Sequence, residues 1–251
     1  MNGPLTLLLL PGTLCNGRVW AGQIDALRAV GPVVVAQYDG ADTIGAMAQH
    51  ALSSVEADAR VVPIGLSMGG MVALEIWRTA RPRVAAMALL ATNPLPDTLA
   101  RHASRNRQIQ DAVGHGMPFV AQQLARAYCD SNAERPEEFV ADIISMASSI
   151  GLDGFRAQSA ALATRHDYRP LLGSINVPVL VMAGKHDRIC GLHAQQQMAA
   201  AIPDATFEAL SEAGHLIPLQ VPDETNRLLL QWLVHIVQPH ATLAATPSRL
   251  P

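Results

Sequence analysis

The sequence predicts an α/β fold, in which a mostly parallel central sheet is flanked by helices and carries a helical insertion. Apolar runs of strand length alternate with segments of helical periodicity, which is typical of a parallel sheet. The alternation stops between residues 96 and 168, where no strand pattern occurs, and then resumes. One apolar run ends in Gly-x-Ser-x-Gly at residues 65–69, directly before a helical pattern. These observations indicate one α/β core interrupted by a helical cap.

Composition limits the classes of protein that the chain can belong to. Its 251 residues are 49% hydrophobic and 16% charged, which is enough apolar material for a large buried core and argues against disorder. The formal net charge is −3, so no basic excess suggests binding to nucleic acid. We expect one large domain with an insertion.

Cysteine usage and hydropathy suggest a cytoplasmic location. Cys15, Cys129 and Cys190 are odd in number and form no C-x-x-C pair, which disfavours a disulfide framework or a zinc site and fits a reducing compartment. The apolar run 5–10 has no basic residue before it and suits a strand better than a signal peptide. No apolar run reaches the length of a membrane span, so no membrane association is expected.

The first part of the core is expected at residues 1–95. The patterns predict strands at 5–10, 32–36, 60–66 and 84–91, and helices at 19–28, 44–55 and 68–80. Residues 5–10 are almost continuously apolar, as in a central strand buried on both faces. Thr43 is the expected N-cap of the second helix.

The cap is expected at 96–168 and the second part of the core at 169–238. In this second part the patterns predict strands at 177–183 and 205–210, and helices at 192–201 and 222–237. Residues 239–251 contain three prolines and show no periodicity. We expect them to form a flexible tail.

Ser67 lies at the centre of the Gly-x-Ser-x-Gly motif. In a nucleophile elbow, a sharp strand-to-helix turn lifts one serine clear of the sheet. Strand and helix then come so close that side chains at Gly65 and Gly69 would collide. The alternative is an ordinary turn serine, so the motif needs support from other residues.

A serine nucleophile needs a histidine to accept its proton and an acid to orient that histidine. In a parallel sheet such groups lie at the C-terminal ends of strands. Asp187 follows the strand predicted at 177–183, and His215 follows the strand predicted at 205–210. The order Ser67, Asp187, His215 therefore predicts a catalytic triad.

Other interpretations of these residues remain open. Asp187 could be a surface turn residue, and His215 could cap a loop. Three rival acids are Glu212, Asp153 and Asp167, and the amide Asn93 follows another strand. The remaining histidines show no ligand spacing, so no metal is expected.

Four segments together resemble the α/β-hydrolases with a helical cap, of the esterase and lactonase (carboxylesterase-like) type. They are Leu-Leu-Leu-Leu-Pro-Gly at 7–12, Gly-Leu-Ser-Met-Gly-Gly at 65–70, Gly-Lys-His-Asp at 184–187 and Ala-Gly-His-Leu-Ile-Pro at 213–218. The resemblance covers residues 5–237 and implies the α/β-hydrolase fold. It implies that Ser67 is the nucleophile, His215 the general base and then acid, and Asp187 the orienting carboxylate, without a cofactor.

The resemblance also implies an oxyanion hole. Its donors would be the backbone N–H of Met68 and one from the first loop, with Thr13 preferred over Leu14. Removing one such donor costs about 3 kcal/mol of transition-state stabilisation. The sequence departs from many relatives at three positions, which are Pro11 instead of His, Gly191 instead of Pro and Gln220 instead of Glu.

The cap contributes candidate pocket and docking residues. Four apolar or aromatic positions could be core residues or could line an acyl pocket: Met117, Phe119, Tyr128 and Met146. A basic run comprises Arg101, Arg105 and Arg107. This run could be a solvated helix face or a docking patch for an anionic substrate or an acyl carrier.

The expected function is that of a serine hydrolase that cleaves a small or medium carboxylic ester, lactone or thioester through an acyl-enzyme. The same triad could instead serve a hydroxynitrile lyase, an acyltransferase or a thioesterase. A ligand-binding protein with low turnover is a further alternative, which the complete set Ser67, Asp187 and His215 argues against. A dehalogenase is disfavoured because that chemistry needs aspartate at the elbow.

Overall fold

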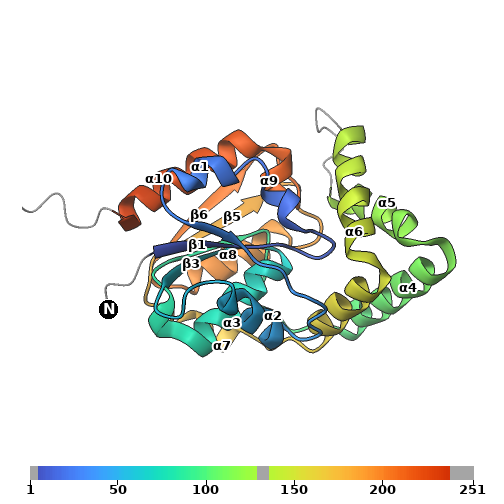
Figure 1. Cartoon of the computed structure of the whole chain (residues 1–251), viewed down its shortest axis with the longest axis horizontal. Helices are drawn as coiled ribbons and strands as arrows, with labels where there is room; N and C mark the ends of the chain where they lie inside the picture. The colour runs from blue at the N-terminus through green and yellow to red at the C-terminus, as the bar shows by residue number, and fades with distance from the viewer. Residues whose placement is uncertain (1–4, 129–135, 238–251) are drawn as a thin grey trace, which may run out of the picture.

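The computed structural model describes residues 5–128 and 136–237. Within them, six parallel strands form one sheet in the order β2-β1-β3-β4-β5-β6. The strands are β1 (Leu5–Leu10), β2 (Val33–Val35), β3 (Arg60–Leu66), β4 (Met87–Leu90), β5 (Val179–Gly184) and β6 (Ala205–Leu210). The predicted parallel sheet is confirmed (Figure 1). The tail expected at 239–251 lies outside the described residues.

Helices cover both faces of the sheet. Leu7 and Leu9 of β1 belong to the apolar core shared with α1 (Ile24–Arg28) and α10 (Pro222–Val237). Leu8 and Leu10 belong to the opposite core, shared with α2 (Ile44–Ser53), α3 (Met68–Ala80) and α8 (Leu192–Ala200). Because successive strand residues point to opposite faces, the apolar run of β1 serves both cores.

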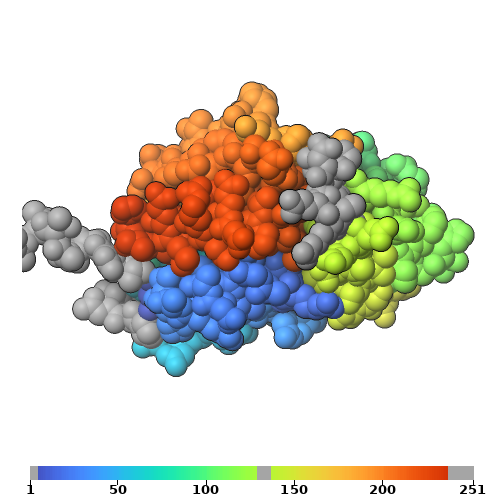
Figure 2. Space-filling view, turned by 90° about the horizontal axis from the view of Figure 1, so that it is seen from above, coloured from blue at the N-terminus to red at the C-terminus, as the bar shows by residue number. Residues whose placement is uncertain are grey.

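The insertion consists of helices. They are α4 (Leu99–His115), α5 (Met117–Tyr128) and α6 (Pro136–Ala163), and α6 contains a kink at Gly151, where φ is 70°. Figure 1 shows these helices beside the sheet, and in Figure 2 they form the yellow-green end of the molecule. None of the described helices has both the length and the apolar character needed to cross a membrane.

Two predicted elements differ from the structure by more than a residue or two at an end. The helix predicted at 19–28 is divided into a 3₁₀ helix, η1 (Gly17–Trp20), and α1. Between them lies Gln23, the N-cap residue of α1, which is fully buried and donates to the carbonyl of Pro218 at 3.2 Å. The strand predicted at 84–91 is shorter, since Val84 forms only an isolated bridge and Ala91 has φ 46°.

Three short helices were not predicted. They are η2 (Arg81–Arg83), α7 (Arg169–Leu172) and α9 (Ile217–Gln220), and each has a proline at one of its first two positions. Proline suits the first turn of a helix because it lacks the N–H that would be unpaired there. Helices of three or four residues are too short to produce a periodic pattern.

Candidate active site

Ser67 occupies a strained turn between β3 and α3. Its φ of 54° and ψ of −112° are unusual for a residue with a side chain. Its N–H donates to the carbonyl of Leu90 at 2.8 Å, and the Thr92 hydroxyl donates to its carbonyl at 2.7 Å. These bonds to the end of β4 hold the strained backbone in place.

The two motif glycines permit the close contact between strand and helix. A Cβ atom at Gly65 would overlap the carbonyl of Gly69, and one at Gly69 would overlap the carbonyl of Leu10. Both obstacles are backbone atoms, which cannot rotate away. The steric requirement predicted for Gly65 and Gly69 therefore holds in the structure.

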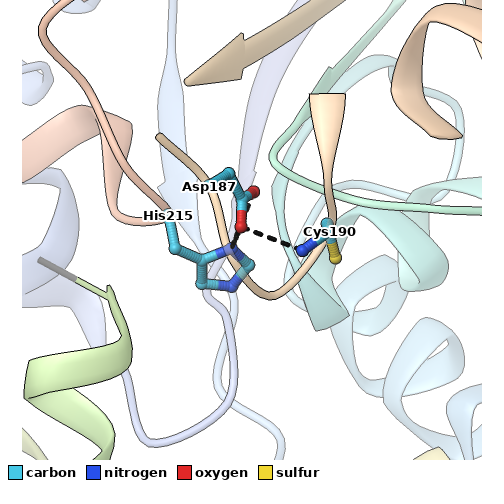
Figure 3. A group of neighbouring side chains, drawn as sticks. All are labelled: Asp187, Cys190 and His215. Carbon is cyan, nitrogen blue, oxygen red and sulfur yellow. Dashed lines mark hydrogen bonds and ion pairs between the residues drawn. The ribbon is translucent and has the colours of Figure 1, made fainter. Parts of the chain in front are cut away.

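Ser67, His215 and Asp187 form one chain of hydrogen bonds. The Nε2 atom of His215 lies 2.9 Å from the Ser67 hydroxyl, and its Nδ1 atom lies 3.0 Å from each carboxylate oxygen of Asp187. Asp187 follows β5 and His215 follows β6, as predicted. Figure 3 shows the imidazole directed at the carboxylate. A proton on Nδ1 leaves Nε2 free to accept the serine proton.

Asp187 is held as a carboxylate in a buried position. It accepts hydrogen bonds from the N–H groups of Ile189 and Cys190 at 2.8 and 2.9 Å, and from the Gln195 amide at 3.3 Å. Burial by itself would raise its pKa, but the interactions with His215 and these N–H groups outweigh burial and lower the pKa. The residue is therefore ionised at neutral pH and can orient and stabilise the imidazole.

The rival acids have other surroundings. Glu212 is exposed, Asp153 pairs with Arg156 on the surface, and Asp167 pairs with Arg169. Asn93 is buried, but its amide donates to the Cys190 sulfur at 3.2 Å. Among the described residues, the carboxylate that contacts His215 belongs to Asp187.

Asp187, Cys190 and His215 also place three ligand-type atoms within 4.8 Å of one another (Figure 3). Burial raises the pKa of the Cys190 thiol to about 12, so it stays protonated and is a poor ligand. The carboxylate of Asp187 and the Nδ1 atom of His215 are already hydrogen-bonded to each other. The chemistry of these donors therefore fits proton transfer to and from Ser67 better than metal binding.

The predicted oxyanion donors do not all remain available. Met68 is the first residue of α3, and the Thr13 hydroxyl contacts its sulfur at 3.8 Å, so the two residues are neighbours. The N–H of Leu14, however, donates to the Gln158 side chain at 2.9 Å. This bond disfavours Leu14 as an oxyanion donor, because its N–H is already used. Met68 and Thr13 remain the candidate pair.

Three polar contacts around the triad were not predicted. Gln158 of α6 binds the loop at Leu14, the carbonyl of Tyr128 accepts the N–H of His215 at 3.1 Å, and Gln195 donates to Asp187. Gln195 could have been noticed, since its spacing of three from Met198 places it on the buried face of α8. The contacts made by the Gln158 side chain and by the Tyr128 carbonyl depend on how the cap packs against the core, for which the sequence gives no local signal.

A cavity of about 270 Å³ contains Ser67 and His215. Tyr128 lines it as predicted, together with five apolar residues that were not predicted: Met71, Leu124, Phe155, Leu162 and Ile189. The other predicted lining residues are not part of its wall. Met117 and Met146 are buried in the apolar core, and Phe119 is 39% exposed beside the ring of His115.

The basic run is divided between two surfaces. Arg101 and Arg105, one helical turn apart on α4, line the cavity, whereas Arg107 is exposed outside it. Two arginines from elsewhere in the chain, Arg165 and Arg188, complete the charged part of the wall. Only Arg101 and Arg105 of the predicted docking patch therefore face the cavity, and the patch itself stays a prediction.

Comparisons with known proteins agree with this geometry. The family model described as the alpha/beta hydrolase family matches residues 7–228. A protein of Serratia proteamaculans that carries the name carbamate hydrolase RutD is 25% identical over 91% of each chain. A thermophilic esterase from Thermogutta terrifontis, solved with malate bound, is 27% identical, has a TM-score of 0.84, and aligns over 93% of this chain and 91% of its own.

A second solved structure extends the likeness in fold. The enol-lactonase from Burkholderia xenovorans LB400 is 22% identical, with a TM-score of 0.82 over 93% of this chain and 92% of its own. The family model spans most of the chain, including all three residues of the hydrogen-bonded chain. The protein accordingly belongs to the alpha/beta hydrolase family and is a hydrolase.

Proposed function

We propose that the protein is a serine hydrolase that cleaves a small carboxylic ester, or a lactone or thioester of similar size. The observation that carries the proposal is the continuous chain Asp187–His215–Ser67, whose serine lies in the wall of a cavity. That cavity, at about 270 Å³, is at the small end for ligand sites, which favours a small substrate.

The geometry supports a two-step reaction. His215 Nε2, 2.9 Å from the hydroxyl, takes the proton of Ser67 as its oxygen attacks the carbonyl carbon. The N–H groups of Met68 and Thr13 stabilise the oxyanion, and His215 returns the proton to the leaving alcohol. Water, deprotonated by His215, then releases the acid from the acyl-enzyme. Asp187 stays ionised and stabilises the imidazolium at each step.

The comparisons support the ester as the bond that is cleaved. A solved relative with 27% identity is an esterase, and the Serratia protein is named for carbamate hydrolysis, which also begins with attack on a carbonyl. No contact among the described residues favours the lyase or acyltransferase alternatives. Transfer of the acyl group to water is therefore the simplest use of this site.

The test combines covalent labelling with turnover. A fluorophosphonate probe should label the wild type at Ser67, and Ser67→Ala should lose both labelling and hydrolysis of p-nitrophenyl acetate. Ser53→Ala serves as the control, because Ser53 is an exposed serine on α2 that hydrogen-bonds only locally. Normal turnover by a folded Ser67→Ala variant would refute the proposal, and labelling without turnover would favour the ligand-binding alternative.

A further inference from the structure

The cavity around Ser67 carries an excess of positive charge. Four of its lining residues are arginines, Arg101, Arg105, Arg165 and Arg188, and no aspartate or glutamate lines it in the part of the chain that the structure describes. The whole chain has the opposite sign, with a formal net charge of −3. The arginines are therefore concentrated at the site and do not reflect a generally basic surface.

Two of these arginines are partly neutralised. Asp97, with a side chain 4% exposed, lies between Arg105 and Arg165 and pairs with both. Arg165 also donates to the carbonyls of Leu95 and Leu162, at 2.8 and 2.7 Å. One carboxylate thus faces two guanidinium groups, which leaves an uncompensated positive charge.

Burial and neighbouring arginines lower the pKa values of Arg105 and Arg165. Burial, and then the neighbouring Arg165, lower the pKa of Arg105 to about 10. Burial, and then Arg101, lower the pKa of Arg165 to about 10 as well. Both groups remain charged at neutral pH, so the repulsion persists until an anion relieves it.

Arg101 and Arg188 are the arginines available to a ligand. Both are exposed; Arg101 makes one side-chain bond, from Nη2 to the carbonyl of Ile189 at 3.0 Å, and Arg188 has no partner among the described residues. Arg101 also lies in the first turn of α4, which contains no acidic residue. A helix dipole disfavours a cation at that end, so helix stability does not explain the position of Arg101.

We propose that the substrate carries a carboxylate, as in a half-ester of a dicarboxylic acid or a carboxylated lactone, and that Arg101 and Arg188 bind this carboxylate. The inference rests on the proposed function and adds the substrate class. Arginine suits the role because its planar donors match a carboxylate. The arginines and Ser67 line the same cavity of about 270 Å³, so the anion and the scissile bond belong to one small molecule.

The experiment compares esters that differ only in the anion. Monomethyl succinate, glutarate and adipate are paired with methyl butanoate, pentanoate and hexanoate, in which a methyl group replaces the carboxylate, and acid release is followed by pH-stat. We expect the wild type to prefer the half-ester at least tenfold in kcat/KM at one of these lengths. The double variant Arg101→Gln/Arg188→Gln should reduce that preference at least tenfold, mainly through KM.

Arg107→Gln is the matched control, since Arg107 is an exposed arginine of the same helix outside the cavity wall. It should keep the preference. Arg105 and Arg165 are left intact because their loss would leave Asp97 buried without its partners. Free glutarate should compete with the half-ester in the wild type and lose at least tenfold in inhibition constant in the double variant.

Three results would overturn the inference: no preference at any length, an unchanged preference in the double variant, or stronger inhibition by inorganic phosphate than by glutarate. A preference that appears only for a carrier-bound acyl group would also overturn it, in favour of a carrier protein. Failure of the proposed function is separately visible, because the wild type would then lack Ser67-dependent hydrolysis of neutral esters as well.

Discussion

The contact between Gln158 and Leu14 offers a direct test of whether the cap positions the loop that holds Thr13, the proposed oxyanion donor. The Gln158 side chain is 6% exposed and accepts the N–H of Leu14 at 2.9 Å. Leu14 has φ 58°, a conformation that costs a leucine about 1–2 kcal/mol. Gln158→Met removes the acceptor while keeping a side chain of similar length, so the strained loop loses a bond that holds it.

The expected loss of activity follows from the backbone strain at Leu14 and from the lost hydrogen bond to Gln158. A buried N–H left without a partner costs about 1–3 kcal/mol, which is enough for the loop to relax toward an unstrained conformation. Thr13, the residue before Leu14, then moves its N–H away from the proposed oxyanion position, and losing one such donor costs about 100-fold or more in kcat. KM should change much less, because the donor acts on charge that develops in the transition state.

The assay is p-nitrophenyl acetate hydrolysis, with fluorophosphonate labelling as a second measurement. Gln158→Glu keeps an acceptor oxygen and should retain most of kcat. Gln122→Met repeats the substitution at an exposed position of the cap and should have no effect. If a folded Gln158→Met variant keeps wild-type kcat, then this bond does not position the oxyanion hole, and the reasoning fails.

Three further predictions concern the triad, the elbow and a buried acid. Asp187→Asn should lower kcat by about four orders of magnitude with a normal fold, because an amide favours the wrong imidazole tautomer; a mild loss would move the role to another acid. Gly69→Ala should destabilise the protein by about 3 kcal/mol or more, because its Cβ meets the carbonyl of Leu10, whereas Gly173→Ala, in open space, should be nearly neutral in thermal unfolding. Burial would raise the pKa of Glu75, but bonds from Arg78 at 2.7 Å and from the Tyr168 hydroxyl at 3.1 Å lower it. A lowered folded pKa gives stability that is present above the unfolded pKa, near 4.3, and lost as pH falls through the folded value. Glu75→Gln should therefore narrow the difference in unfolding free energy between pH 7 and pH 3; an unchanged difference in urea titrations would contradict this.

The core of the fold could be predicted from the sequence because its signals are local. β3, α3, β6 and α10 begin and end at the predicted residues, since each is marked by an apolar run or a helical period with a clear boundary. Thr43 caps α2 as expected, with its side chain accepting the N–H of Ala46. The break between the 3₁₀ helix at Gly17–Trp20 and α1 was missed because four residues are too few to show a helical period of their own.

The residues at the ends of β3, β5 and β6 could likewise be named from the sequence, because parallel strands bring their carboxyl ends to one edge. The hydrogen bonds among these residues depend on the fold, and so do the cap residues that line the cavity. For example, Gln158 accepts the N–H of Leu14 from more than a hundred residues away, which leaves Thr13 as the candidate donor. Arg101 and Arg107 lie on one predicted helix, yet only one of them lines the cavity. The sequence by itself singled out Ser67, Asp187 and His215 as candidates, through local pattern and their order at strand ends. Only the tertiary structure decided the wall of the site, since helical periodicity shows which face of a helix is apolar but not which element that face meets.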